Sequence, residues 1–129
     1  MSHARLSLYQ EVDAATADPG RRLLMLLAGA ERWLRQARSA LIADDRATFI
    51  RSMSRAHAIV GAVADALDEA AGAEVAANLA RLYDWALRHL TLGLARRSAG
   101  HIDDVLVVLG EIRAGFEGAV AAVRRGDAG

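Results

Sequence analysis

The sequence predicts an all-α protein, an up-down-up-down antiparallel four-helix bundle with an N-terminal strap or short helix. Three observations predict this class. Ala, Leu and Arg, which all favour helices, are prominent in the 129 residues. Apolar residues recur at helical spacing along most of the chain, and no alternating strand pattern competes. The one proline is Pro19, so no later residue of this type interrupts a helix.

The first helix is expected over residues 19–43. Asp18 can cap it, and Pro19 suits the first helical position. Its apolar residues nearly encircle the helix, at Leu23, Leu24, Met25, Leu26 and Leu27. A helix that faces one core needs an apolar stripe of only about 100°. We therefore expect part of this surface to be covered by another segment, since a large exposed apolar patch is sticky.

Three more helices are expected, over residues 46–70, 73–97 and 102–124. The second stripe runs through Phe49, Met53, Ala56, Val60, Val63 and Leu67. The third stripe runs through Val75, Leu79, Leu82, Ala86, Leu90 and Leu94, and the fourth through Ile102, Val105, Leu109, Ile112, Phe116 and Val120. Asp44 or Asp45 can cap the second helix, while Gly72 and Gly100 are expected to end the second and third. Short connections between such helices favour antiparallel neighbours.

One domain of this kind would span residues 18–125. Residues 1–17 stand apart as the strap, because Leu6, Leu8, Tyr9 and Val12 are too few to form a core of their own. Residues 126–129 are expected to be a frayed tail.

Composition excludes several function classes. The chain has no Cys, so disulfides, thiol catalysis and Cys-bound zinc are ruled out. Its formal net charge of zero argues against a general nucleic-acid binder. The sequence has neither a secretory signal pattern nor an apolar run of about 18 residues, so we expect a cytoplasmic protein without membrane insertion.

Catalytic and cofactor motifs are missing from the sequence. The Gly residues are scattered and form no phosphate loop. Di-metal bundles carry Glu-x-x-His, but Ser54, Ala86 and Ser98 stand three residues before the histidines of the helices. We expect no catalytic residues, no metal site and no cofactor, and therefore no enzyme.

Two alternatives remain open at this point. His57 and Gly61 match part of the pattern of histidine phosphotransfer bundles, although Val60 stands where that pattern has Lys. A phosphoimidazole needs a nearby cation, so this reading is the weaker one. The Ala-rich face with Ala76, Ala77 and Ala80 would also allow a structural bundle that self-associates.

Four segments, taken in order, resemble the flagellar secretion chaperone family, FliS. They are YQEVDAATADPGRRLLMLLAG (9–29), RAHAIVGAVADALD (55–68), GAEVAANLARLYDWALRHL (72–90) and IDDVLVVLGEIRAGFE (102–117). The family usually reads M-L-Y-D-G where this chain has Leu27 and Ala28 in place of Tyr and Asp. Phe116 stands where the family has a Trp near the end of the last helix.

The resemblance implies an adaptor rather than an enzyme. Family members bind the C-terminal segment of flagellin in the cytoplasm, prevent its premature polymerisation and help deliver it to the flagellar secretion apparatus. A component of the export gate is an expected further partner. The surplus Leu of the first helix would then be covered by the strap, by the client, or by each in turn. The residues expected to bind the partner are Tyr9, Val12, Leu24, Met25, Leu27, Leu79, Leu82, Tyr83 and Leu87.

Overall fold

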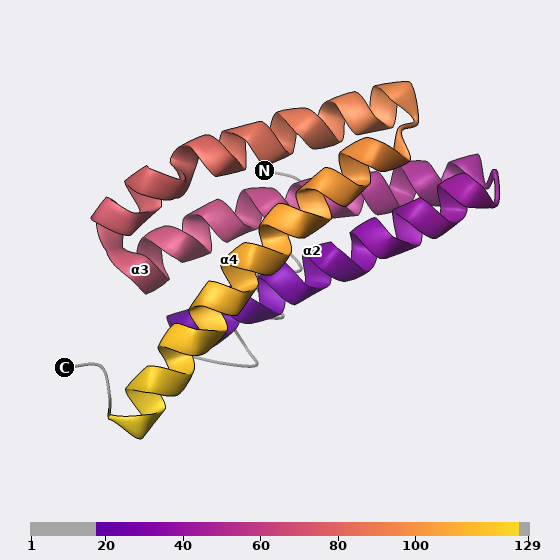
Figure 1. Cartoon of the computed structure of the whole chain (residues 1–129). Coiled ribbons are helices and arrows are strands. Elements are labelled where there is room, and N and C mark those ends of the chain that lie inside the picture. Colours follow the sequence, from indigo (N-terminus) through magenta and orange to yellow (C-terminus); the bar gives the residue numbers. More distant parts are fainter. Residues whose placement is uncertain (1–17, 127–129) are drawn as a thin grey trace.

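The computed structural model describes residues 18–126, apart from the side chains of residues 68–72, 76 and 119–125. Its elements are α2 (Pro19–Ile42), α3 (Arg46–Arg96) and α4 (Ala99–Arg125) (Figure 1). Every secondary-structure element of the described part is a helix, which confirms the all-α class. The strap expected over residues 1–17 lies outside the described residues, as do residues 127–129.

The long helix α3 doubles back on itself. In a straight helix, Met53 and Gly93 would be about 60 Å apart at the usual rise per residue. Instead the Met53 Cε lies 3.4 Å from where a Cβ on Gly93 would stand. We call residues 46–67 the first limb of α3 and residues 73–96 the second limb; Figure 1 shows the bend between them. The backbone is helical at Gly72, so the expected helix stop there is wrong, although the chain does reverse in this region.

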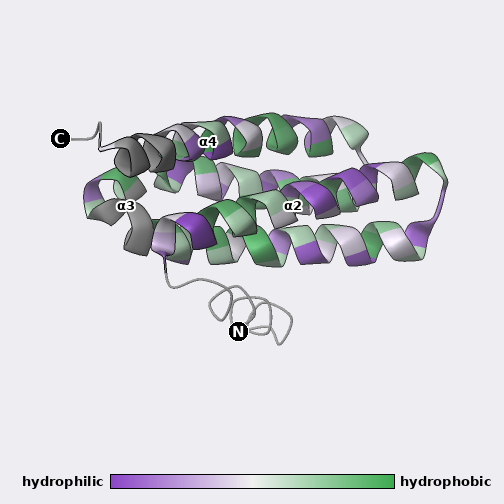
Figure 2. Ribbon diagram, turned by 90° about the horizontal axis from the view of Figure 1, so that it is seen from below, coloured by the Kyte–Doolittle hydropathy of each residue, from purple (hydrophilic) through white to green (hydrophobic). Residues whose placement is uncertain are grey.

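Both short turns lie at one end of the molecule. Asp44 belongs to the turn before α3 and Arg97 to the turn before α4, and their side chains form an ion pair of 2.9 Å. Both residues have a positive φ, 56° and 52°, which lets the chain turn sharply. As a result α2, the two limbs and α4 lie side by side (Figures 1 and 2).

Carboxylates cap two helices at their N-termini. Asp18 accepts a hydrogen bond from the backbone N–H of Gly20 (2.9 Å), and Asp45 accepts one from the N–H of Thr48 (3.2 Å). These contacts satisfy donors that a helix cannot pair internally. The end of α3 differs from expectation, because Arg97 takes the left-handed cap position and Gly100 already belongs to α4.

The core lies between α2, the two limbs of α3 and the first half of α4. The stripe expected on the first limb is confirmed, since all six of its members are buried. On α2 the buried apolar residues include Leu23, Leu26, Leu27, Ala30, Leu34 and Ala37. On α4 they are Ile102, Val105 and Leu109, with Ile112 and Phe116 partly buried against them.

The stripe expected on the second limb is confirmed in part, since Ala86 and Leu90 are buried and Leu79 and Leu94 pack against the core. Tyr83, Ala86 and Leu90 are buried, whereas Leu82 is 38% exposed and Val75 is 41% exposed. The expectation that Leu82 faces the core with the rest of its stripe is therefore wrong. Because apolar residues occupy several faces of this limb, the sequence does not show which face is buried. In the structure Tyr83 faces the core and Leu82 does not.

Candidate functional site

The expected partner-binding residues of α2 fall into different environments. Met25 is 44% exposed and Leu24 is partly buried, so both can be reached from solvent. Leu27 is fully buried and belongs to the core cluster. Tyr9 and Val12 lie outside the described residues.

Those of the second limb divide in the same way. Leu82 is exposed, while Leu79 and Leu87 are partly buried against the core. Tyr83 is only 5% exposed, and its hydroxyl has no hydrogen-bond partner among the described residues. Burial raises the pKa of Tyr83 to about 12, so the hydroxyl stays protonated at neutral pH.

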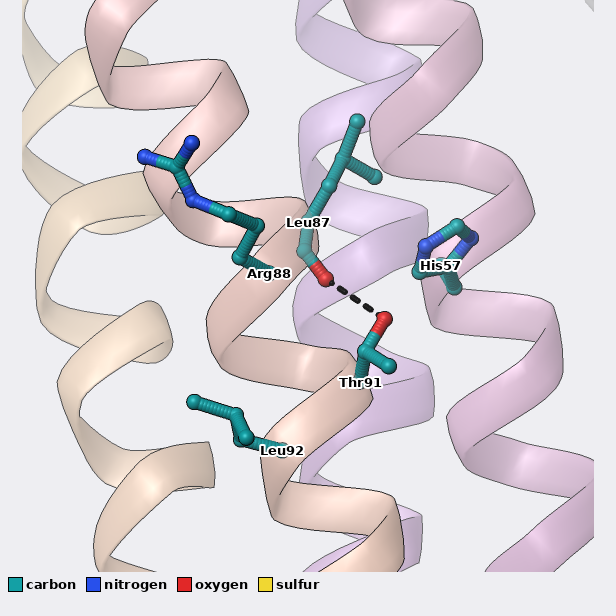
Figure 3. Close-up of a pocket in the computed structure, with 5 residues that line it drawn as sticks. All are labelled: His57, Leu87, Arg88, Thr91 and Leu92. Atoms are coloured by element: carbon teal, nitrogen blue, oxygen red, sulfur yellow. Dashed lines mark hydrogen bonds between the residues drawn. The ribbon is translucent and has the colours of Figure 1, made fainter.

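Two hollows lie along the two limbs of α3. The first is lined by Arg46, Phe49, Ile50, Leu94, Ala95 and Arg97. The second is lined by His57, Leu87, Arg88, Thr91 and Leu92 (Figure 3). Each hollow takes residues from both limbs, so it exists only because α3 folds back. We call these lining residues together the α3 face.

The floor of the α3 face is largely apolar. Ile50 is 46% exposed and Leu92 is 39% exposed, whereas large aliphatic side chains are usually buried. The Thr91 hydroxyl donates to the carbonyl oxygen of Leu87 at 3.0 Å (Figure 3). Its one donor is therefore used within the helix, so the floor between the bordering cations makes little polar demand on a ligand. Such a surface suits the apolar side of a peptide.

Cations border this floor. Arg46 and Arg97 line the first hollow, and Arg88 lines the second. His57 stands across the apolar floor from Arg88, on the neighbouring limb (Figure 3). No carboxylate is among the described residues that line either hollow.

Arg88 is the one arginine among the described residues that line the second hollow, and it does not supply the cation that the phosphotransfer alternative needs beside the imidazole. His57 is exposed on the first limb, and the Arg88 side chain points away from it, beyond Leu87 and Thr91 (Figure 3). Val60, at the position where a cation would be needed, is buried. For the self-association alternative, Ala77 and Ala80 are exposed on the second limb.

A ring stack joins the second limb to α4. His89 lies between Trp85 and His101, with ring centroids 4.6 Å and 4.2 Å away. The His89 Nε2 lies 2.9 Å from Asp104 Oδ2, and the His101 Nδ1 lies 2.8 Å from Ser98 Oγ. In the part of the chain that the structure describes, no group of three or more His, Asp or Glu is placed to hold a metal ion. We therefore interpret the ring stack as a packing contact between the second limb and α4.

Sequence reasoning missed most of the α3 face. It named Leu87 but not Ile50, Arg88 or Leu92, because no pattern within one helix shows which residues border a gap between two. The sequence predicted a helix stop at Gly72 and antiparallel neighbours, but it did not show which residues of the two limbs would lie beside each other. Within the described helices, none is both long and apolar enough to cross a membrane.

Comparisons with known proteins identify a family and a relative that match most of the chain. A family model described as "Flagellar protein FliS" matches residues 1–123. The flagellar secretion chaperone FliSB of Pseudomonas aeruginosa strain PAO1 is 30% identical over 108 residues. That match covers 84% of this chain and 86% of the relative.

Proposed function

Since this chain belongs to the FliS family, we propose that it is a flagellar secretion chaperone that binds the C-terminal segment of flagellin. It would act in the cytoplasm, keep that segment from polymerising and aid its delivery to the secretion apparatus, with an export-gate component as a further partner. The function needs no catalysis. The printed name of the P. aeruginosa relative and the extent of the family match support this proposal.

The α3 face is the proposed docking surface. The observation that carries this choice is the gathering of exposed aliphatic side chains over two hollows, with Ile50 and Leu92 respectively 46% and 39% exposed. A client that folds on binding loses conformational entropy, and apolar burial is the main term that offsets this loss. Amphipathic helices bind to proteins by laying their apolar side in such hollows.

The other expected residues are assigned according to their burial. Leu24, Met25, Leu79 and Leu82 are accessible and are proposed as further client contacts, together with Tyr9 and Val12 of the strap. Leu27 and Tyr83 are enclosed in the core of the folded chain, so the proposal assigns them to the stability of the bundle and not to direct contact with the client.

Calorimetric titration with the C-terminal segment of flagellin from the same source tests the proposal. We expect one-to-one binding with a negative heat-capacity change, which marks apolar burial. Ile50→Asp and Leu92→Asp should each weaken binding at least about tenfold, because a carboxylate would be buried against the client. Val107→Asp is the matched control, since Val107 is 60% exposed on α4 and lines neither hollow.

The outcomes separate the surface from the function. If all three variants bind like the unmodified chain, the α3 face is not the docking surface. If the unmodified chain gives no heat and forms no complex on a sizing column, flagellin is not its client. Sedimentation of the chain alone then tests self-association, which predicts a concentration-dependent dimer.

A further inference from the structure

We propose that the α3 face selects an amphipathic helix that carries carboxylates beside its apolar residues, with Arg46 and Arg88 as the selecting side chains. This inference rests on the proposed function and states the chemistry of the docking segment. It would make the face a specificity filter as well as an apolar surface.

The charge of the face is one-sided. Each hollow has an arginine at its border, Arg46 in one and Arg88 in the other, and His57 adds a second basic group to the latter. Among the described residues no acidic side chain lines either hollow. The whole chain has 16 basic and 16 acidic residues, so this local excess of cations comes from their placement and not from the composition.

Some arginines of the bundle already have acidic partners, and one of these arginines, Arg97, belongs to the α3 face. Arg38 binds Asp103, Arg113 binds Glu31, and Arg97 binds Asp44. Arg46 and Arg88, like Arg32, Arg51 and other exposed arginines, form no ion pair with any residue in the described part of the chain. Their guanidinium groups remain available to a ligand.

A carboxylate at the edge of an apolar contact is worth more than one on an open surface. Exposed ion pairs contribute little, since water and salt screen them. A docked helix would exclude water from one side of each pair, and Arg can donate two parallel hydrogen bonds to one carboxylate. The ion pairs between these arginines and the client carboxylates would thus form where the docked helix reduces screening by water and salt.

The spacing fits about three turns of a client helix. From Arg46 to His57 the first limb rises about 16 Å, which is the length of this limb that the two hollows together occupy. A helix lying along the limbs would place apolar residues at positions i, i+4 and i+7 over the hollows and acidic residues beside them. A nucleic acid fits less well, since Phe49, the aromatic residue of the first hollow, is only 2% exposed and offers no ring for base stacking.

Salt-dependent titration of the full chain with the flagellin segment tests the inference. The test variant is Arg46→Gln/Arg88→Gln. The control variant is Arg32→Gln/Arg51→Gln, which also removes two exposed positive charges but changes no residue of the α3 face. In 50 mM NaCl we expect the test variant to bind about tenfold or more weakly than the control. In 500 mM NaCl the two should converge, because the Debye length is then only a few ångströms.

A pair of synthetic peptides provides an independent readout. One is an acidic amphipathic helix, and the other is the same peptide with each Glu replaced by Lys. The chain should prefer the acidic peptide, and Arg46→Glu/Arg88→Glu should reverse that preference. Circular dichroism and thermal melting check that each variant is folded.

Each result bears on a different claim. Equal affinity of the test and control variants for flagellin at both salt concentrations overturns the inference and leaves the proposed function intact. Failure of flagellin to bind overturns the proposed function, and the peptide pair then decides the inference alone. Equal binding of the two peptides would overturn it.

Discussion

Gly93 on the second limb of α3 lies against His101 on α4, so that a Cβ on Gly93 would stand 3.0 Å from the Cβ of His101. Such a distance is tighter than nearly all real Cβ contacts, so the neighbouring helix would have to move by a few tenths of an ångström within a closely packed interior. The missing side chain therefore allows the two helices to approach. It also leaves His101 in place to stack on His89 at 4.2 Å.

Gly93→Ala should destabilise the bundle in spite of the better helix propensity of Ala. Alanine gains roughly 1 kcal/mol over glycine inside a helix. Against this, overpacking of a tight contact costs about 1–3 kcal/mol, and Met53 closes the other side, with its Cε 3.4 Å from the new Cβ. Urea denaturation should show a lower free energy of unfolding.

Gly115→Ala is the matched control on α4. Nothing lies within 4 Å of its added Cβ, so the helix-propensity gain of roughly 1 kcal/mol should appear undiminished. If both substitutions stabilise the protein equally, the second limb and α4 are not held at the close distance described.

Leu109→Ala and Leu82→Ala should differ widely in cost. Leu109 is fully buried, and its truncation should lower the free energy of unfolding by about 2–5 kcal/mol. Leu82 is 38% exposed, so its loss removes much less buried area and should cost under about 1 kcal/mol. Chemical denaturation of both variants measures the difference. Equal large costs would place Leu82 back in the core.

These two residues also show how far the sequence could predict the fold. On the first limb one stripe, from Phe49 to Leu67, keeps helical spacing throughout, and all six of its members are buried. On the second limb either Leu82 or Tyr83 could face the core. Helical periodicity alone does not show which of the two is buried. The contact of Gly93 with His101 depends on how two helices cross, which no single-helix pattern contains.

The candidate site was harder to predict than the fold. Leu24, Met25 and Leu27 look alike in sequence, but the structure exposes Met25 and encloses Leu27. Whether an apolar residue lies in a core or on a binding surface depends on which elements cover it. The same holds for Arg88, whose availability to a ligand follows from the lack of a described acidic partner.

Removing Arg113 should strand a buried carboxylate. Glu31 is buried on α2, and the Arg113 Nε donates to its Oε2 at 2.6 Å, while Arg35 lies farther away at 3.8 Å. Arg113→Leu should therefore lower Tm more than the double variant Glu31→Leu/Arg113→Leu, because an unpaired buried charge costs more than an apolar pair. Thermal melting at neutral pH compares the two. The opposite order would mean that water solvates Glu31.

Arg38→Gln should change how acid destabilises the protein. The hydrogen bond from Arg38 to Asp103, 2.7 Å long, together with its positive charge, lowers the pKa of that carboxyl below 3.8. A lowered folded-state pKa gives stability that is present above the unfolded value and is lost as the pH falls through the folded value. The variant should thus be less stable than the unmodified chain at pH 6, and the gap should close as the pH drops below 3.8 toward the folded pKa.

Titration of the carboxyl groups by NMR checks this at the level of single residues. In Arg38→Gln the pKa of Asp103 should rise toward 3.8. Asp45 is the internal control, since hydrogen bonds from Thr48 rather than from Arg38 are the main cause of its lowered pKa. If both pKa values rise together, the substitution has perturbed the whole bundle. If neither moves, the Arg38–Asp103 pair is not formed in solution, and α2 and α4 are joined in this region by apolar packing alone.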